Sequence, residues 1–381
     1  MINNTDRINT WQTFILIVST INAIEVLIFP RQLAIKVGTD GWLPLIVGHF
    51  LAGIAVFFLI KLGLLFPNET FAQYAPRIAG KIVGTFFVLM AVSFWVLVTA
   101  RILREFGDFI HLILDRTPPE VIVLSMLITA ASVSWFGIEP ITRVCEILFP
   151  LFIGLILTLI LLAVPMSDFS NLLPVLTSDI KDILVSTIDI TLGLEGKEIL
   201  TMLLPFMTVQ AQAYKAEYAA LGFNLFLRLV IYIVTISVFG AEITKMFIWP
   251  VEDLGRIIAA PGQFLGRLDA LFIALWVSAT FSSIIIFYYL AGLSFSQLFK
   301  LKNHQVGMLV LFPIIIFISL LPKNMVKTEQ FSDMVSFLFG ILVFIVPLLL
   351  LAVTYIRGLH KNGQKVQRGK PKKRGRMLKN A

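Results

Sequence analysis

Apolar segments of membrane length recur along this 381-residue chain, and they constrain its fold more than any other feature. About 20 helical residues, rising about 1.5 Å each, cross a hydrocarbon core of about 30 Å, so an apolar run of about 18 residues predicts a membrane helix. Only 14% of the residues are charged and 58% are hydrophobic, whereas about a quarter of the residues of a soluble domain are charged. The sequence therefore predicts an all-α integral membrane protein.

We expect ten membrane spans, and their approximate bounds are 11–37, 42–65, 82–113, 121–135, 141–164, 183–209, 220–243, 268–299, 306–321 and 331–355. They form one membrane domain over residues 1–356, followed by a basic tail over 357–381 that we expect to be disordered. The polar opening residues lead into the first span without a small-residue cleavage site, so we expect no cleaved signal peptide. Ten spans place both termini on the same side of the membrane.

The basic tail accounts for the positive charge of the chain. The formal net charge is +8, and residues 357–381 carry ten Lys or Arg and no acid, so the rest of the chain carries 8 minus 10, or −2. A polybasic segment after a membrane helix favours a cytoplasmic location and binds anionic lipid. Nucleic acid is a poor fit as a partner, because no aromatic platform or folded module accompanies these Lys and Arg residues.

Ten spans also divide into a five-plus-five inverted repeat, because an odd number of spans per half gives the two halves opposite orientations. Many secondary transporters are built this way, with interrupted helices at corresponding places, here spans one and six. Asn22 and Glu25 lie 11 and 14 residues after the start of span one, and Gly193 and Lys197 lie 10 and 14 residues after the start of span six. The sequence therefore predicts that both spans are broken.

The break is best supported in span six, where residues 189–198 place charges inside an apolar run. An ionisable side chain at the bilayer centre costs roughly 2.5 to 3.5 kcal/mol on insertion scales, so Glu195, Lys197 and Glu198 should face one another, a cavity or a ligand. Two glycines three residues apart permit unusual backbone angles. The half-helices would expose free N–H and C=O groups that bind small zwitterions and cations. The alternative is an internal salt bridge of Lys197 with Glu195 or Glu198.

Span one has no glycine at its candidate break, and its Pro30 would bend the helix nearer Phe29. Glu25 has no basic neighbour in sequence, so it needs a partner from another span or must sit protonated in a cavity. It contacts a ligand amine, carries a proton, or lies in a solvated vestibule. Arg228 in span seven poses the same question and is expected to pair with a carboxylate or to extend toward the interface.

Other polar groups allow less specific expectations. Arg101 with Glu105 and Arg104 with Asp108 have the i, i+4 spacing of ion pairs and predict a solvated helix end. The hydroxyls of span eight suit either a sodium site, with Ser282 and Ser283 as weak candidates, or hydrogen bonds to their own helix backbone.

Catalysis is not expected. The four histidines show no ligand spacing, and the single cysteine has neither a disulfide partner nor a nearby base. We therefore expect no enzyme activity, no metal and no cofactor.

Several short patterns, taken together in this order, resemble the spore-germination B-subunit family, the polytopic component of nutrient germinant receptors. They are Phe29-Pro-Arg-Gln-Leu-Ala34, Gly38-Thr-Asp-Gly-Trp42, Phe66-Pro67, Gly80-Lys81 with Gly84, Leu103-Arg-Glu-Phe106, Thr117-Pro118, Gly137-Ile-Glu139 through Glu146, Phe149-Pro150 and Asn171-Leu-Leu-Pro174. The resemblance covers most of the chain before the tail. It implies a ten-span, LeuT-like fold of the amino acid/polyamine/organocation superfamily.

The resemblance also implies a function. Such a subunit binds a small nutrient germinant, commonly an amino acid or a sugar, in the spore inner membrane, and it works with a larger membrane subunit of A type and a C-type lipoprotein. Binding would favour a conformation that opens an ion path through the assembled receptor. Two alternatives are an ion-coupled secondary transporter of amino acids or related solutes, and a scaffold with a vestigial pocket.

Mapped onto this chain, the resemblance implies a ligand pocket at the two breaks. The residues assigned to it are Asn22, Ala23, Ile24 and Glu25 of span one, Gly193, Leu194, Glu195, Gly196 and Lys197 of span six, and, as walls, Ser93 and Thr99 of span three and Ser278 of span eight.

Overall fold

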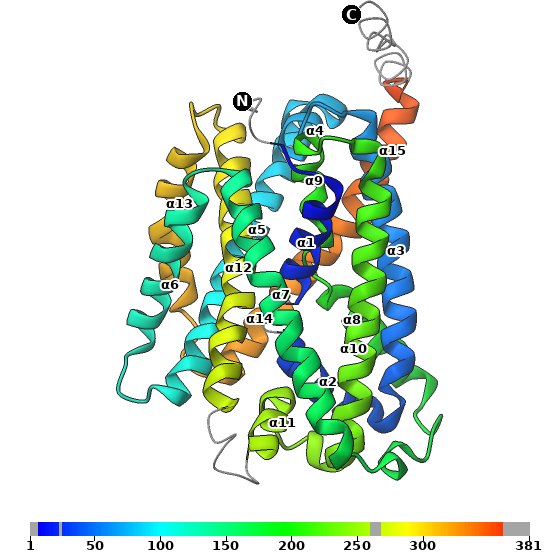
Figure 1. Ribbon diagram of the computed structural model, residues 1–381. Coiled ribbons are helices and arrows are strands. Elements are labelled where there is room, and N and C mark those ends of the chain that lie inside the picture. The colour runs from blue at the N-terminus through cyan, green and yellow to red at the C-terminus, as the bar shows by residue number, and fades with distance from the viewer. Residues whose placement is uncertain (1–6, 23–24, 260–267, 361–381) are drawn as a thin grey trace, which may run out of the picture.

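The computed structural model describes residues 7–22, 25–259 and 268–360, and this part of the chain is almost entirely helical (Figure 1). Within it, β pairing is limited to one isolated bridge between Ile8 and Met207. The predicted all-α class is therefore confirmed. Of the predicted basic tail only residues 357–360 are described, and its disorder stays a prediction.

The helices follow one another along the chain as α1 (Thr10–Ile21), α2 (Glu25–Val37), α3 (Trp42–Leu65), α4 (Phe71–Ala79), α5 (Lys81–Ile113), α6 (Pro119–Ser134), α7 (Ile138–Ala163), α8 (Ile180–Gly193), α9 (Leu200–Leu203), α10 (Ala213–Thr244), α11 (Pro250–Ala259), α12 (Leu268–Leu298), α13 (His304–Ser319), α14 (Met325–Gly340) and α15 (Val346–Ile356). Two short turns matter below: the 3-10 turn η4 (Lys197–Ile199) and the π-helical turn η7 (Ile341–Ile345).

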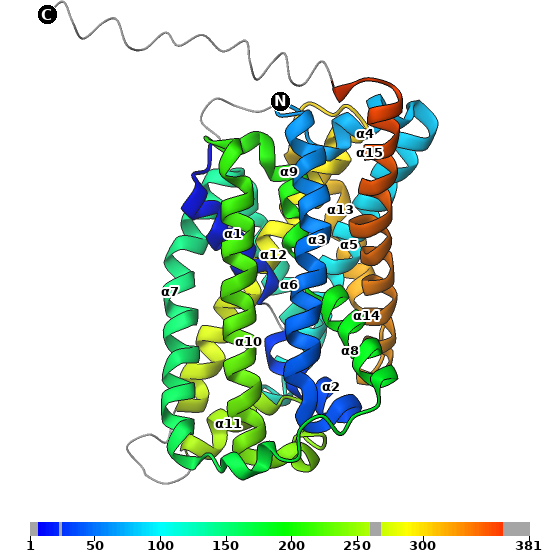
Figure 2. The same ribbon diagram turned by 90° about the vertical axis from the view of Figure 1, so that its right-hand side faces the viewer.

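Long helices run along one common direction and form a single bundle (Figures 1 and 2). Helix α1 begins and α15 ends at the same end of this bundle, which we call the terminal end; α11 lies at the opposite end, the far end. This arrangement agrees with the prediction that both termini lie on one side.

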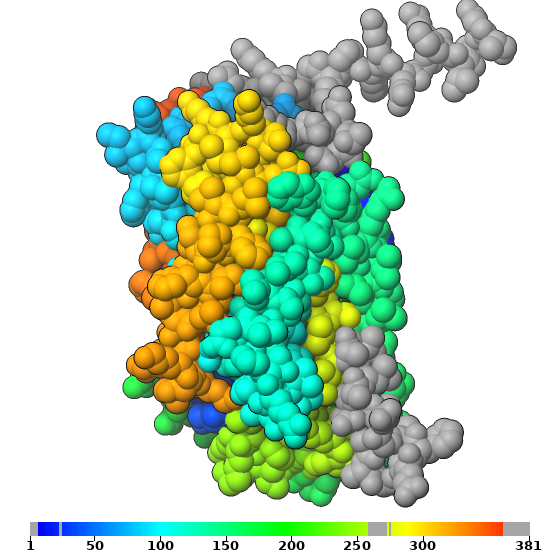
Figure 3. Space-filling model, turned by 90° about the vertical axis from the view of Figure 1, so that its left-hand side faces the viewer, coloured from blue at the N-terminus to red at the C-terminus, as the bar shows by residue number. Residues whose placement is uncertain are grey.

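Six helical segments of the described chain are long and apolar enough to cross a membrane, and they span Glu25–Leu65, Lys81–Ile113, Ile138–Met166, Gln210–Thr244, Trp276–Leu298 and Met325–Ile356. Three shorter apolar helices, α1, α6 and α13, accompany them. Helices α6 and α13 lie side by side on one outer face (Figure 3), where Ile128, Leu309 and Phe317 are exposed. Such an apolar outer surface fits lipid. The count of ten spans stays a prediction.

Both predicted interruptions are present. The apolar run 11–37 is divided into α1 and α2, and the run 183–209 is divided into α8, η4 and α9. The π-helical turn between α14 and α15 and the two short helices α4 and α11 were not predicted. Helix α4 starts with a capping box, in which the Thr70 and Gln73 side chains satisfy each other's backbone N–H groups, a local signal that marks a helix start.

Close helix packing positions the broken helices. Gly48 of α3 lies against Ile190 of α8, and a Cβ at Gly48 would come within 2.8 Å of the Ile190 side chain. Helix α10 packs along both α1 and α3. The break of α8 and the end of α1 are thereby held against the same inner surface.

Candidate functional site

The two helix breaks meet in the interior of the bundle. Gly196, with φ of +121°, follows the end of α8, and a Cβ there would lie 2.9 Å from Thr20 Cβ and 3.0 Å from the backbone nitrogen of Ile21. Gly193, the last residue of α8, faces Glu25, whose Oε2 would lie 3.1 Å from an added Cβ. Both glycines are therefore points of close approach to the broken first span. Ala23 and Ile24, also assigned to the pocket, lie outside the described residues.

Lys197 satisfies carbonyls that the break of α8 leaves free. Lys197 Nζ donates to the Thr191 and Leu194 carbonyls, at 3.0 Å each, and lies 4.2 Å from the centre of the Phe339 ring. A cation on the carbonyl end of a helix is favoured by the helix dipole, and the ring adds a cation–π contact. Within the described chain no carboxylate forms an ion pair with Lys197, so the alternative of a direct salt bridge to Glu195 or Glu198 is wrong.

Arg101 of α5 is the centre of the charged cluster. Its guanidinium lies 2.6 Å from Glu195, 3.4 Å from Glu25 and 3.5 Å from Glu105, and its side chain is only 6% exposed. Arg228 of α10 shares Glu25, at 3.5 Å. Two buried cations therefore hold three carboxylates from α2, α5 and the break of α8, as paired burial of charge requires.

The predicted solvated helix end at Arg101 is wrong. The i, i+4 spacing does give the ion pairs Arg101–Glu105 and Arg104–Asp108. However, α5 continues to Ile113, and both arginines are buried. The reason is that Arg101 compensates a carboxylate of α2 and one in the break after α8, which the local spacing did not show.

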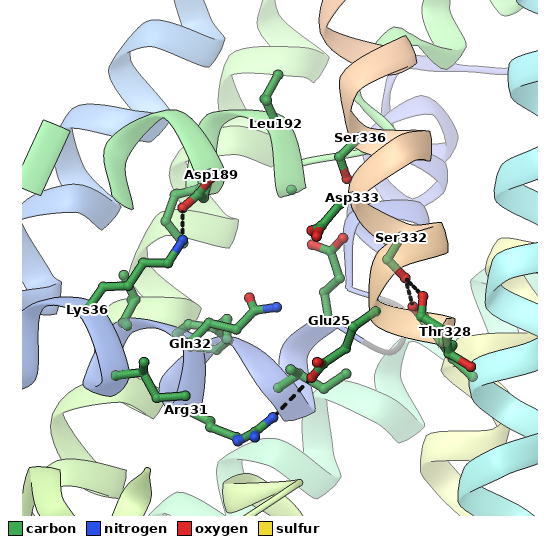
Figure 4. A pocket seen from close by; sticks show the side chains of 18 of the residues that line it. Glu25, Arg31, Gln32, Lys36, Asp189, Leu192, Thr328, Ser332, Asp333 and Ser336 are labelled. Atoms are coloured by element: carbon green, nitrogen blue, oxygen red, sulfur yellow. Dashed lines mark hydrogen bonds and ion pairs between the residues drawn. The ribbon is translucent and has the colours of Figure 1, made fainter. Parts of the chain in front are cut away.

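A cavity of about 610 Å³ extends from this cluster to the far end of the bundle. Its lining includes Glu25 and Gly193 at the break, Lys36 near the end of α2 and Met325 at the start of α14. In Figure 4 the Glu25 and Asp333 side chains point into this space from α2 and α14. Solvent at the far end therefore has a route to the buried charges.

Charges of both signs line the cavity. The acids are Glu25, Glu105, Asp108, Asp189, Glu329 and Asp333, and the bases are Arg31, Lys36, Arg101 and Arg228. Toward the far end, Arg31 pairs with Glu329. Lys36 pairs with Asp189, as Figure 4 shows.

Unused hydrogen-bonding atoms remain at the inner end. Arg101 Nε, Arg228 Nε and Glu105 Oε2 are buried and have no hydrogen-bond partner among the described residues. Guanidinium N–H groups suit a carboxylate, and a carboxylate oxygen accepts from an ammonium. Arg101, Arg228 and Glu105 line the cavity, so a shift of these side chains would present both kinds of group to a small solute.

The structure brings most, but not all, of the assigned residues together. Glu25 and Gly193 line the cavity, and Glu195 meets Arg101 at its inner end. Asn22, Leu194, Gly196 and Lys197 are assigned residues that form a buried layer behind this lining.

The proposed walls lie elsewhere. Ser93 is exposed on the outer face of α5, and the Thr99 hydroxyl donates to the Trp95 carbonyl. Neither they nor Ser278 are among the residues that line the cavity. Of the two weak sodium candidates, Ser282 donates to the Ser278 carbonyl of its own helix, whereas Ser283 donates to the Ser19 carbonyl of α1 at 2.8 Å and to the Ala279 carbonyl of its own helix at 3.4 Å.

Helix α14 is the wall that the sequence did not predict. Ser332 donates to Glu105 at 2.7 Å, and Ser336 donates to Glu195 at 3.4 Å. With Thr328 these serines repeat every four residues, which places three hydroxyls on one helical face. That spacing was a usable signal.

Comparisons with known proteins agree with this architecture. The family described as "Spore germination protein" matches residues 7–328. Spore germination protein YndE of Bacillus subtilis (strain 168) is 30% identical over 373 residues, which cover 96% of this chain and all of the relative. Spore germination protein A2 of the same organism is 24% identical, covering 92% and 96%, and GerLB of Bacillus cereus is 25% identical, covering 91% and 93%.

Two solved structures share the fold. MhsT, in the crystal structure of its complex with L-phenylalanine, aligns with a TM-score of 0.67 at 13% identity and covers 90% of this chain and 97% of MhsT. MHP1, a nucleobase-cation-symport-1 family transporter in a closed conformation with bromovinylhydantoin bound, aligns with a TM-score of 0.60 at 12% identity, covering 88% and 77%. At these identities the likeness shows the fold alone, and it confirms the predicted LeuT-like architecture with broken helices.

Proposed function

Because this chain belongs to the spore germination protein family, we propose that it is the membrane subunit of a nutrient germinant receptor and that its cavity binds a small germinant at mid-membrane. The observation that carries the proposal is the inner end of the cavity, which is lined by Arg101, Arg228 and Glu105, each with one buried atom that has no hydrogen-bond partner among the described residues. An amino acid offers the matching carboxylate and ammonium. The similarity in fold to MhsT, which was solved with L-phenylalanine, supports this ligand class.

Binding triggers germination only if the germinant favours one of two conformations. A solute carboxylate on the guanidinium groups competes with Glu25 and Glu195, which now hold those groups. These two carboxylates belong to α2 and to the break of α8, so the competition acts directly on the half-helices. In this proposal the assembled receptor, with its A-type subunit and C-type lipoprotein, responds to the resulting movement of the half-helices.

The proposed setting is the spore inner membrane, with both termini and the terminal end on the core side and the basic tail on anionic lipid. The cavity would then open away from the core. We propose a binding role rather than catalysis, since the charged groups are positioned for a zwitterion.

Glu195→Gln tests the site. The substitution removes the charge that faces Arg101 at 2.6 Å, and a hydrogen bond to a charged group contributes roughly 1.5 to 3 kcal/mol. In a deletion strain complemented with this variant, we expect the nutrient dose response of germination to shift by about tenfold or more at normal protein levels. Glu242→Gln, which changes the exposed partner of Lys245, is the matched control. An unchanged dose response for Glu195→Gln would rule out the proposed site.

Gly193→Ala is expected to act more mildly. Its backbone is helical, so alanine adds no strain and favours the helix by about 0.5 to 1 kcal/mol. The new Cβ would lie 3.1 Å from Glu25 Oε2 and must displace that carboxylate by a few tenths of an ångström. We expect the nutrient dose response of germination to be weakened by roughly threefold to tenfold, with unchanged thermal stability in detergent. Lower stability with unchanged sensitivity would contradict this assignment.

An ion-coupled secondary transporter is the second candidate. The similarity in fold to MHP1, a nucleobase-cation-symport-1 family transporter, favours it. Purified protein in proteoliposomes separates the two proposals, because a transporter concentrates a labelled amino acid against its gradient without other subunits. Such uptake would support the transporter, whereas binding without uptake supports the receptor.

A further inference from the structure

A chain of buried hydrogen bonds joins the end of α1 to α10 and α3. Asn22 Nδ2 lies 2.9 Å from the Val18 carbonyl, and Asn224 Nδ2 lies 2.8 Å from Asn22 Oδ1. His49 continues the chain, with Nε2 at 2.8 Å from Asn224 Oδ1 and Nδ1 at 2.7 Å from the Leu45 carbonyl. All three side chains are buried. The chain therefore fixes the residue at which the first span breaks.

This hydrogen-bond chain needs one more donated hydrogen than its side chains supply when all of them are neutral. Both ends are carbonyls, which only accept, and four contacts therefore require four donated hydrogens. Each amide donates to one neighbour and accepts from the other, and a neutral imidazole does the same, so the three groups donate three. Turning an amide by 180° exchanges its oxygen and nitrogen. The contact that lacks a hydrogen then lies elsewhere in the hydrogen-bond chain, but it is still present. All four contacts have hydrogen-bond distances, so the geometry leaves none open.

We propose that His49 is a proton-binding site and that its proton completes the chain that ties α1 to α3 and α10. An imidazolium donates from both ring nitrogens, which supplies the fourth hydrogen. Buried polar groups are almost always hydrogen-bonded, and a protonated ring satisfies every member here. This proton site is independent of the identity and of the existence of a germinant.

Burial of the ring opposes this proton, and so do its charged neighbours. Arg228 of α10 and Lys197 of η4 are both cations close enough to act on His49. Glu25 compensates Arg228, and the carbonyls at the end of α8 hold Lys197. From α8 itself the neighbour is neutral, since Thr191 donates to the Gly48 carbonyl. Two bonds from a charged donor therefore act against the burial of the ring and against two partly compensated cations, so the ring holds its proton only while the hydrogen-bond chain is closed.

Release of the proton has a definite structural consequence. One of the four contacts must then open, and Asn22 is the member nearest the break, with Arg228 bonded to the carbonyl of the preceding Ile21. Opening at Asn22 frees its amide and loosens the end of α1 beside Glu25. The site thus links a proton to the mobility of the broken helix.

Nitrogen-15 spectroscopy tests the protonation directly. The protein has four histidines, so the substitutions His111→Gln, His304→Gln and His360→Gln together leave His49 as the only histidine. With ¹⁵N-histidine label and the full chain in lipid vesicles at pH 7, solid-state NMR is expected to show both ring nitrogens protonated. A spectrum with one unprotonated ring nitrogen would overturn the proposal.

Asn22→Ala in the same background tests the cause. The substitution removes the contacts to Val18 and Asn224, so the Asn224 amide can turn and donate to Nε2 while Nδ1–H donates to Leu45. A neutral ring then satisfies the remaining chain, and we expect one ring nitrogen to lose its proton at pH 7. The control is Asn303→Ala, an exposed asparagine, which should leave both nitrogens protonated. A doubly protonated ring in Asn22→Ala would show that the chain does not hold the proton.

Discussion

Arg101→Met is expected to remove most of the folded protein. The substitution leaves Glu25, Glu105 and Glu195 without the guanidinium that contacts all three. Breaking a buried ion pair by removing one partner costs about 3 to 5 kcal/mol, a large share of the roughly 5 to 15 kcal/mol that stabilises a typical protein. The measurement is the yield of monodisperse protein in detergent and its thermal midpoint.

Two variants separate the buried charge from general effects of losing an arginine. Arg143→Met removes an exposed arginine that pairs with Glu139 on the same helix, and such surface pairs contribute at most about 1 kcal/mol. Arg101→Lys keeps the charge but cannot reach several carboxylates with a planar fork, so it should recover only part of the stability. If Arg101→Met were as stable as the parent, the carboxylates would not need a counter-charge and the cluster would have another basis.

Much of the fold was predictable, because a bilayer imposes simple rules on helix length and polarity. The apolar runs located most of the helices, and Gly193 and Gly196 indicated the break of α8. Span one was harder, since only Asn22, Glu25 and the symmetry argument pointed to a break there. The two short helices α4 and α11 were missed because neither is long enough to produce an apolar run.

The charged site was predictable only in part. Glu25 and Glu195 were recognised as buried carboxylates that need partners, and both partners are arginines within predicted spans. Sequence spacing shows which residues share a helical face, but it does not show which helix that face meets. For Arg101 the local partner Glu105 fitted a solvated helix end equally well, so the spacing did not indicate the further partners Glu25 and Glu195.

The walls were misplaced for a related reason. Ser93 and Thr99 were chosen for their hydroxyls, without regard to the face of α5 that must carry Arg101. Phe94, Val98 and Arg101 follow the i, i+4, i+7 spacing of one buried face, and Ser93 lies off it. The same rule applied to α14 would have selected the hydroxyls that do meet the site.

Gly196→Ala is expected to have the second largest effect. With φ of +121° and ψ of −22°, Gly196 has a conformation that costs other residues about 1 to 3 kcal/mol. The new Cβ would also lie 3.0 Å from the backbone nitrogen of Ile21, which cannot rotate away as a side chain can. The end of α1 must therefore move, and the two breaks separate. We expect a lower thermal midpoint and a nutrient dose response weakened by more than tenfold.

Alanine substitutions at Gly196, Gly193 and Gly222, compared with one another, distinguish the effect of backbone strain from the effect of displacing a charge. Gly222→Ala, in α10 with nothing within 4 Å of an added Cβ, should leave both stability and response unchanged. Gly193→Ala displaces a carboxylate without backbone strain, so it should weaken the response alone, whereas Gly196→Ala should lower both. If Gly196→Ala behaved like Gly222→Ala, the contact between the two breaks would be dispensable. If Gly193→Ala lowered stability more than Gly196→Ala, the position of Glu25 rather than that contact would hold the two halves together.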